Sequence, residues 1–298
     1  MKLLTLNTHA WHEDEQEHKI RQLADFINER GFDLIALQEV NQSPAAAEAS
    51  VEQLARYYEA EPGTTIRADN YALLLIELLD APYHWSWLST HSAYQGRYDE
   101  GVAVLTREPI TDARYGYVSG IRDYMNYKTR RMLGVKTSLA PAGGEETGED
   151  RVLDATAKEP TGESDSFWLF SAHCGWWHDE EEPFRGQWDR AEDLLKPLRD
   201  AGERIFMLGD LNNVAQIRGE GYDYVMERGW CDLYTAAAEK DEGSTVLKAI
   251  AGWSDNERPL RIDYILCSET IEAKKSEVVL DGRNGPVVSD HFGVAAEA

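Results

Sequence analysis

The hydrophobic positions of this chain predict short strands that end in polar residues. The clearest case is the apolar run at 205–208, which is too short for a helix and is followed by Gly209, Asp210 and Asn212. This pattern is typical of a buried strand that runs into a loop. Asp210 and Asn212 are two residues apart, so a strand-like backbone would aim both side chains the same way. Because ligands of open α/β sheets bind at the carboxyl ends of parallel strands, both are candidate site residues, although Gly-Asp and Asn-Asn are also ordinary turn dipeptides.

A strand–helix–strand unit is predicted in the first 39 residues. Residues 3–6 form a short apolar strand that stops at Asn7, and apolar positions at helical spacing follow as far as Gly31, where a helix C′ glycine belongs. Residues 34–37 then form a second strand before Glu39. Since a βαβ unit carries a parallel pair of strands, Asn7 and Glu39 are expected at the same edge of the sheet.

The same periodicities predict the remaining elements. A surface helix is expected over 44–60, and a more apolar helix over 71–79 with Asp69 as its cap. Further strands are predicted at 84–88 (half-buried), 101–105, 133–139, 167–172 and 264–266, and further helices at 184–195 and 222–228, before a final polar and apolar segment at 289–294. The alternation of helices and strands favours a mixed α/β sandwich, with two packed sheets and helices outside.

One segment differs in composition from the rest. Residues 140–166 are rich in Gly, Pro, Thr and Ser and hold eight acidic residues against two basic ones. Strands resume at once on its far side, so an acidic flexible insertion is expected there rather than a domain linker. Residues 1–298 are therefore interpreted as a single domain.

Charge and cysteine content narrow the classes of function. The net charge of −24 would repel a polyanion and lacks the basic footprint of a nucleic-acid binder, so neither nucleic acid nor an anionic membrane is an expected partner. The chain shows no signal-peptide pattern and no apolar run of transmembrane length, which predicts a soluble, cytoplasmic protein; the oligomeric state has no signature. Three scattered cysteines make neither a disulfide framework nor a zinc site. Cys174 adjoins His173, but a small buried cysteine is common, so a nucleophilic role for it is not expected.

Polar side chains at the strand ends make up one candidate constellation. Its members are Asn7, Glu39, His173, Asp210, Asn212, Asp263, Asp290 and His291. Carboxylates and amides without cysteine suit Mg²⁺ or Mn²⁺, and such an ion would supply the positive charge that phosphoryl transfer needs. A histidine beside a metal-binding aspartate can act as an acid or a base if another carboxylate orients its ring, as Asp263 would for His291. Each histidine by itself is more often structural.

Seven segments of the chain resemble those of the endonuclease/exonuclease/phosphatase superfamily, the group of DNase I, apurinic endonucleases, neutral sphingomyelinases and inositol-polyphosphate 5-phosphatases. They are LTLN at 4–7, LQE at 37–39, EGVAVL at 100–105, SAH at 171–173, LGDLN at 208–212, RIDY at 261–264 and SDHFG at 289–293. They stand in the family's order and extend from residue 7 to 293, so the resemblance covers the whole chain.

The resemblance implies a DNase I-like fold, a four-layer α/β sandwich with two packed mixed β-sheets flanked by helices. It also implies Mg²⁺-dependent cleavage of a phosphoester by water, with Mn²⁺ as a substitute for Mg²⁺. Glu39 would be the principal metal ligand. Asn7 and Asp290 would complete or adjoin the metal shell.

The resemblance implies catalytic roles as well. Asp210 and Asn212 would hold or activate the attacking water and bind the phosphoryl group. His291, oriented by Asp263, and His173 would serve as acid/base groups or as phosphate donors. Members of the family are interpreted differently on whether the counterpart of Asp210 or of His291 takes the proton of the water.

Five further segments are similar to those of bacterial maltose 6′-phosphate phosphatases: RYDEG at 97–101, KTR at 128–130, GWW at 175–177, DEEEPF at 179–184 and GW at 252–253. This similarity implies a small phosphorylated sugar as substrate. Indole faces suit the C–H faces of a sugar ring, and a guanidinium group suits a phosphate dianion. The substrate-binding candidates are Glu100, Arg130, Trp176, Trp177 and Trp253. A core tryptophan and a solvated strand-edge arginine are the alternatives.

Three functions are therefore compared. The favoured one is a metal-dependent phosphatase acting on a small phosphorylated sugar or a related metabolite. A phosphodiesterase or nuclease would be expected to show a basic groove, and a sphingomyelinase-like enzyme a secretion signal or an exposed apolar hairpin, and the sequence shows none of these. A catalytically inactive scaffold would be expected to lack one of the site residues, and all are present.

Overall fold

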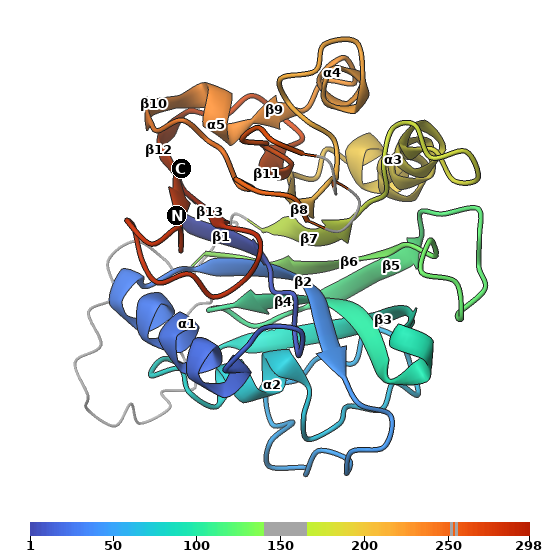
Figure 1. Ribbon diagram of the computed structural model, residues 1–298, viewed down its shortest axis with the longest axis vertical. Coiled ribbons are helices and arrows are strands. Elements are labelled where there is room, and N and C mark those ends of the chain that lie inside the picture. The colour runs from blue at the N-terminus through green and yellow to red at the C-terminus, as the bar shows by residue number, and fades with distance from the viewer. Residues whose placement is uncertain (140–165, 251–252, 254–255) are drawn as a thin grey trace, which may run out of the picture.

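Two mixed β-sheets packed face to face form the centre of the computed structural model (Figure 1). The structure describes residues 1–139, 166–250, 253 and 256–298. Helices cover the outer face of each sheet, so the predicted DNase I-like sandwich is confirmed (Figure 1). The acidic insertion predicted at 140–166 lies outside the described residues except for Ser166.

The first sheet has seven strands in the order β10-β12-β13-β1-β2-β4-β3. Their bounds, in that order, are Ala237–Lys240, Ala273–Val279, Gly293–Glu297, Lys2–Asn7, Leu34–Gln42, Tyr98–Thr106 and His84–Ala93. β1 and β2 are parallel, and helix α1 (Gln16–Arg30) connects them and ends at Gly31 with a φ of 64°. The βαβ unit predicted from the first 39 residues is therefore confirmed.

The second sheet has six strands in the order β5-β6-β7-β8-β11-β9. Their bounds are Asp112–Tyr117, Arg131–Thr137, Phe167–His173, Ile205–Asp210, Asp263–Cys267 and Cys231–Asp232. β8 pairs in parallel with β7 and antiparallel with β11, in a register that sets Asp210 opposite both His173 and Asp263. Two strands therefore end, and one begins, at the same edge of this sheet.

Three apolar layers hold the sandwich together. Residues such as Leu34, Leu169 and Phe206 fill the space between the two sheets. Helix α1 and the short helix α2 (Tyr71–Ile76) pack against the outer face of the first sheet, and α3 (Phe184–Asp200) and α4 (Gly221–Met226) against that of the second. The 3-10 turn Tyr94–Gly96 and helix α5 (Leu233–Ala236) complete the described helices. None of these helices combines the length and the hydropathy needed to cross a bilayer.

The helix predicted over 44–60 is wrong, because the chain forms a series of turns there. Its alanine and glutamate content favours a helix, but its apolar side chains pack from these turns against two different layers, Leu54 against the layer under α1 and Tyr58 against the layer between the sheets, and Val51 is 83% exposed. Asp69 does not cap α2. Its carboxylate instead accepts from the Ser43 backbone N–H, and the side chain of Asn70 accepts from the first backbone N–H groups of the helix.

Some strands also differ from their predictions. β3 is longer than 84–88 and buried on both faces rather than half-buried, because Trp85 and Trp87 pack toward the helices while Leu88 packs between the sheets. β6 starts and ends two residues before the predicted 133–139. Strands β5, β9, β10 and β12 were not predicted, since they are short or largely polar.

Candidate functional site

The polar strand ends of both sheets converge on a cavity of about 890 Å³. All predicted site residues line this cavity except Asn7 and Asp263, and each of these two is hydrogen-bonded to a residue that does. The structure therefore brings together the full set of predicted site residues.

A bulge in β2 accounts for the position of Glu39. The pairing of β2 with β4 shifts between Leu37 and Val40, and Glu39 has a φ of 49°. At the neighbouring strand end, Nδ2 of Asn7 donates to Oε1 of Glu39 at 2.9 Å and to Oδ2 of Asp210 at 3.2 Å. One amide thus ties together carboxylates that come from different sheets.

A tight turn after β8 positions Asn212. Its φ is 51°, and its backbone N–H donates to Oδ1 of Asp210 at 2.8 Å while Nδ2 lies 3.2 Å from Oδ2. The predicted pairing of Asp210 with Asn212 is present, but its predicted cause, strand alternation, is wrong. Gly209 permits the close approach of β7, since a Cβ atom there would lie 1.9 Å from the Ala172 carbonyl oxygen.

His291 and Asp263 form a buried pair. Nδ1 of His291 lies 3.0 Å from Oδ2 of Asp263, and Nε2 lies 3.8 Å from Oδ2 of Asp210. Burial alone would lower the pKa of His291, but the charges of Asp263 and Asp210 raise it to about 10. Burial and the charge of Asp263 raise the pKa of Asp210 above its usual range. The ring orientation predicted for His291 is thus present in the structure.

His173 lies on the other side of Asp210, with Nε2 3.6 Å from Oδ2 of the carboxylate and Nδ1 3.4 Å from Nη1 of Arg130. Burial and the positive charge of Arg130 lower the pKa of His173. Arg130 is only 5% exposed, so it is not a solvated strand-edge arginine. Glu100 lies 3.9 Å from Arg130, and burial and the charge of Glu39 raise its pKa to about 8.

Aromatic side chains line one side of the cavity. Trp176 and Trp177 follow β7, and the rings of Phe184 and Tyr224 contact Trp177, so this tryptophan belongs partly to the core. Nε1 of Trp176 is buried and has no hydrogen-bond partner among the described residues. Trp253 donates its indole N–H to Oδ1 of Asn212 at 3.2 Å. Aromatic rings therefore line the cavity directly beside polar site residues such as Asn212.

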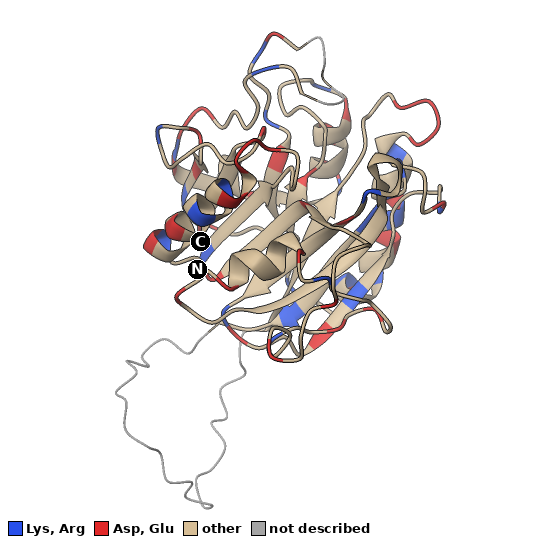
Figure 2. Ribbon diagram, turned by 60° about the horizontal axis from the view of Figure 1, so that its bottom comes forward, with Lys and Arg blue, Asp and Glu red and all other residues tan. Residues whose placement is uncertain are grey.

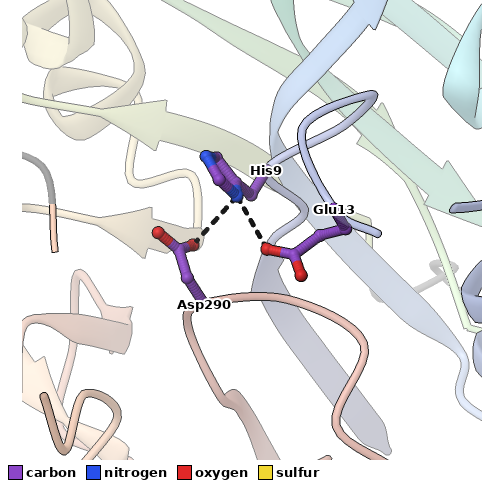
Figure 3. A group of neighbouring side chains, drawn as sticks. All are labelled: His9, Glu13 and Asp290. Atoms are coloured by element: carbon purple, nitrogen blue, oxygen red, sulfur yellow. Dashed lines mark hydrogen bonds and ion pairs between the residues drawn. The ribbon is translucent and has the colours of Figure 1, made fainter. Parts of the chain in front are cut away.

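Sequence reasoning missed several residues of this cavity. Tyr94, Met125 and Tyr127 line it although each is more than half exposed. His9 also lines it and lies near Glu13 and Asp290 (Figure 3). The signal for His9 was its place two residues after Asn7, at the end of a predicted strand. Exposed residues on loops carry no such signal.

The residues present fit a divalent cation. The described residues that line the cavity include six carboxylates but only one lysine or arginine, Arg130; the acids are Glu39, Glu100, Asp179, Asp210, Glu220 and Asp290. Carboxylate and amide oxygens are hard ligands, and the raised pKa values of Asp210 and Glu100 have carboxylate repulsion among their causes. Glu39, Asp210 and Asp290, with the amide of Asn7 beside them, offer the donors.

Solved structures of similar proteins support the fold. An endonuclease/exonuclease/phosphatase family protein from Leptotrichia buccalis is 29% identical, with a TM-score of 0.79 and coverage of 100% of this chain and 98% of the other. The Bacteroides thetaiotaomicron mannosyl-6-phosphatase Bt3783 is 15% identical, with a TM-score of 0.61 and the same coverage. Danio rerio TDP2 in complex with a single-stranded DNA product is 12% identical, with a TM-score of 0.59 and coverage of 99% and 97%.

A match to a family model settles the family. No curated protein matches the chain. The superfamily resemblance of the motifs is confirmed, whereas the closer similarity to maltose 6′-phosphate phosphatases stays a prediction. The model of the endonuclease/exonuclease/phosphatase family matches residues 12–291, nearly the whole chain, and the protein therefore belongs to this family of phosphoester hydrolases.

Proposed function

We propose that this protein is a Mg²⁺-dependent phosphatase that removes phosphate from a small phosphorylated sugar or a related metabolite. The observation that carries the proposal is the convergence of the strand-end carboxylates, amides and histidines on one cavity, where Arg130 is the single arginine among the described lining residues. Such a set suits a metal-assisted attack of water on a phosphoester.

Glu39 would be the principal Mg²⁺ ligand, with Asn7 and Asp290 completing or adjoining the metal shell. The bound ion would supply the positive charge that the transferring phosphoryl group requires, and Mn²⁺ would substitute for it. The hydrogen bonds from Asn7 to Glu39 and Asp210 support this assignment, because they hold the two carboxylates close together before any ligand binds.

Asp210 would orient the attacking water and accept its proton. Its carboxylate is held by Asn7 and Asn212, which leaves little freedom in its direction. His291, oriented by Asp263, would donate from Nε2 to a phosphoryl oxygen, and the amide of Asn212 would add a second donor. His173, on the other side of Asp210, would be a further donor to the phosphoryl group.

Size and lining support a small polar leaving group. A cavity of about 890 Å³ is larger than a phosphate ion needs and falls within the range of small-molecule sites. Trp176, Trp177 and Trp253 would contact the faces of a sugar ring, and Arg130 with Glu100 would contact the phosphate and its neighbouring hydroxyl groups. Acidic residues lie along many of the loops (Figure 2), and the net charge of −24 disfavours a polynucleotide.

The test is phosphate release from a panel of phosphorylated hexoses and disaccharides, with and without Mg²⁺. A nicked-plasmid assay and a choline phosphodiester run beside it. Mg²⁺-dependent release confined to sugar phosphates is the expected result. Plasmid nicking or cleavage of the diester would replace the phosphatase by a phosphodiesterase, and Mg²⁺ binding without any turnover would replace it by a binding protein.

A further inference from the structure

A second group of possible metal ligands lies at the edge of the cavity. Nδ1 of His9 is 2.7 Å from Oε1 of Glu13 and 3.7 Å from Oδ1 of Asp290 (Figure 3). His9 and Glu13 stand in the loop between β1 and α1, and Asp290 stands shortly before β13. All three side chains are partly buried and point toward one another, so a cation could bind them without a large rearrangement.

The donor atoms of the group fit a cation of the transition-metal class. One imidazole nitrogen and two carboxylate oxygens lie within 4.8 Å of one another. Imidazole suits transition metals, whereas Mg²⁺ prefers oxygen ligands throughout. The site would therefore differ in selectivity from the all-oxygen set around Glu39.

The charges around the cavity are compatible with a cation at this group. The described lining residues include six carboxylates and one arginine, Arg130, and a phosphate ester would add further negative charge. Asp179 is offset by Lys128, at 2.9 Å. Lys19 lies 2.6 Å from Oε2 of Glu13, so it offsets that carboxylate from the side away from His9. Asp290 forms no ion pair with a lysine or arginine among the described residues, so its carboxylate is available to a cation beside His9.

We propose that His9, Glu13 and Asp290 bind a second divalent cation, of the transition-metal class, beside the catalytic ion. The inference rests on the proposed function in one respect, since Asp290 would be shared between the two ions. The catalytic ion would depend on Glu39 and the second ion on His9, and this separates the two sites experimentally.

The test is to count bound Mn²⁺ by electron paramagnetic resonance of the free ion during titration of the purified protein. Wild type is expected to bind two Mn²⁺, and the Glu39→Gln and His9→Ala variants one each. His18→Ala is the matched control, because His18 is exposed on α1, and it should bind two. Nitrogen couplings from a bound imidazole should be present in wild type and Glu39→Gln and absent in His9→Ala.

Two results would overturn the second site while leaving the catalytic ion intact. One is a single Mn²⁺ in wild type that only Glu39→Gln removes. The other is an unchanged count and unchanged nitrogen couplings in His9→Ala. A Mn²⁺ count unaffected by Glu39→Gln, together with Mg²⁺-independent turnover, would instead contradict the proposed function.

Lys19→Ala separates ligation from a structural role of the loop. Lys19 competes with a cation for Glu13, so its loss should tighten the second Mn²⁺ several-fold, by about 1 kcal/mol for one partly exposed ion pair. If His9 and Glu13 served only to hold the loop through the lysine, the same change would loosen Mn²⁺ binding or leave it as it was. Thermal unfolding of each variant verifies that it is folded.

Discussion

Two groups that each contain a histidine and two carboxylates meet at the cavity, and they are built differently. In the first, Asp210, Asp263 and His291 are at most 4% exposed. In the second, His9, Glu13 and Asp290 are all partly exposed. Burial strengthens electrostatic interactions and fixes geometry, while partial exposure lets side chains adjust to what they bind.

The two groups also differ in how the backbone positions them. Strand pairing sets Asp210 directly opposite Asp263, and His291 is then fixed by its bond to Asp263. His9 depends on a loop and has a φ of 43°. Rigid elements hold reacting groups more precisely than loops do, which suits the first group to chemistry and the second to binding.

The largest effect is expected from His291→Ala. Losing one acid/base group typically lowers turnover by about 10²–10⁴-fold, and the fold should survive because the ring contributes no strand pairing. Initial rates of phosphate release on the best substrate measure the change. His18→Ala, on the exposed face of α1, is the control and should retain wild-type turnover. Wild-type turnover in His291→Ala would contradict the assignment of the first group to chemistry and of the second group to binding.

Asp263→Asn should cost less than loss of the ring itself. The amide has nearly the same shape but no charge to hold His291, so the ring stays and its orientation is poorly defined. Loss of a group that orients an active residue typically costs about 10–100-fold. The loss is expected in kcat with KM nearly unchanged, since Asp263 does not line the cavity. An equal rise in KM would mean that Asp263 shapes the substrate site instead.

The first group was predictable from the sequence because strand ends are marked by abrupt changes from apolar to polar residues. Asp210 ends the buried apolar run of β8, and parallel pairing with β7 puts it at the same edge as His173. The position of Asp263 opposite Asp210 required the register of β8 and β11, which no local pattern encodes. The pairing of Asp263 with His291 was inferred from the chemistry of a histidine that needs an orienting carboxylate, and the resemblance to a family implied the same pair.

The rest of the site could not be predicted from the sequence, because its geometry depends on the backbone and on tertiary contacts. The bulge that turns Glu39 is set by the pairing of β2 with β4, not by residue type. The left-handed turn at Asn212 has a conformation that asparagine favours, and the sequence offered it only as the alternative to a strand-like backbone. Tyr94 and Met125 lie in loops whose course depends on the strands they connect. The fold shows the same limit, since the long apolar strands were predicted, whereas the polar strand β12 is recognised only by its pairing with β10 and β13.

Trp253→Phe measures how much the indole of Trp253 contributes to holding Asn212, which in turn donates to Asp210 of the first group. The change removes the indole donor to Oδ1 of Asn212 and keeps an aromatic ring. One hydrogen bond is worth about 1 kcal/mol, so kcat/KM should fall by roughly five-fold. Trp230→Phe removes an indole hydrogen bond to Glu192, outside the cavity-lining set, and is the control for loss of an indole donor elsewhere. Equal effects of the two substitutions would show that only general stability had changed.

The smallest change in turnover is expected from substitution of Cys174. This substitution tests whether a residue that is buried beside the site takes part in the reaction for that reason alone. The thiol is as buried as the first group and adjoins His173, and burial raises its pKa to about 12. A thiol that stays protonated is neither a nucleophile nor a metal ligand. Cys174→Ala should therefore keep kcat/KM within about two-fold of wild type, because such a change removes a small apolar contact. Iodoacetamide at neutral pH should leave the wild-type rate of phosphate release unchanged. If iodoacetamide inactivates the wild type and Cys174→Ala prevents this loss, the thiol takes part in the reaction together with Asp210, Asp263 and His291.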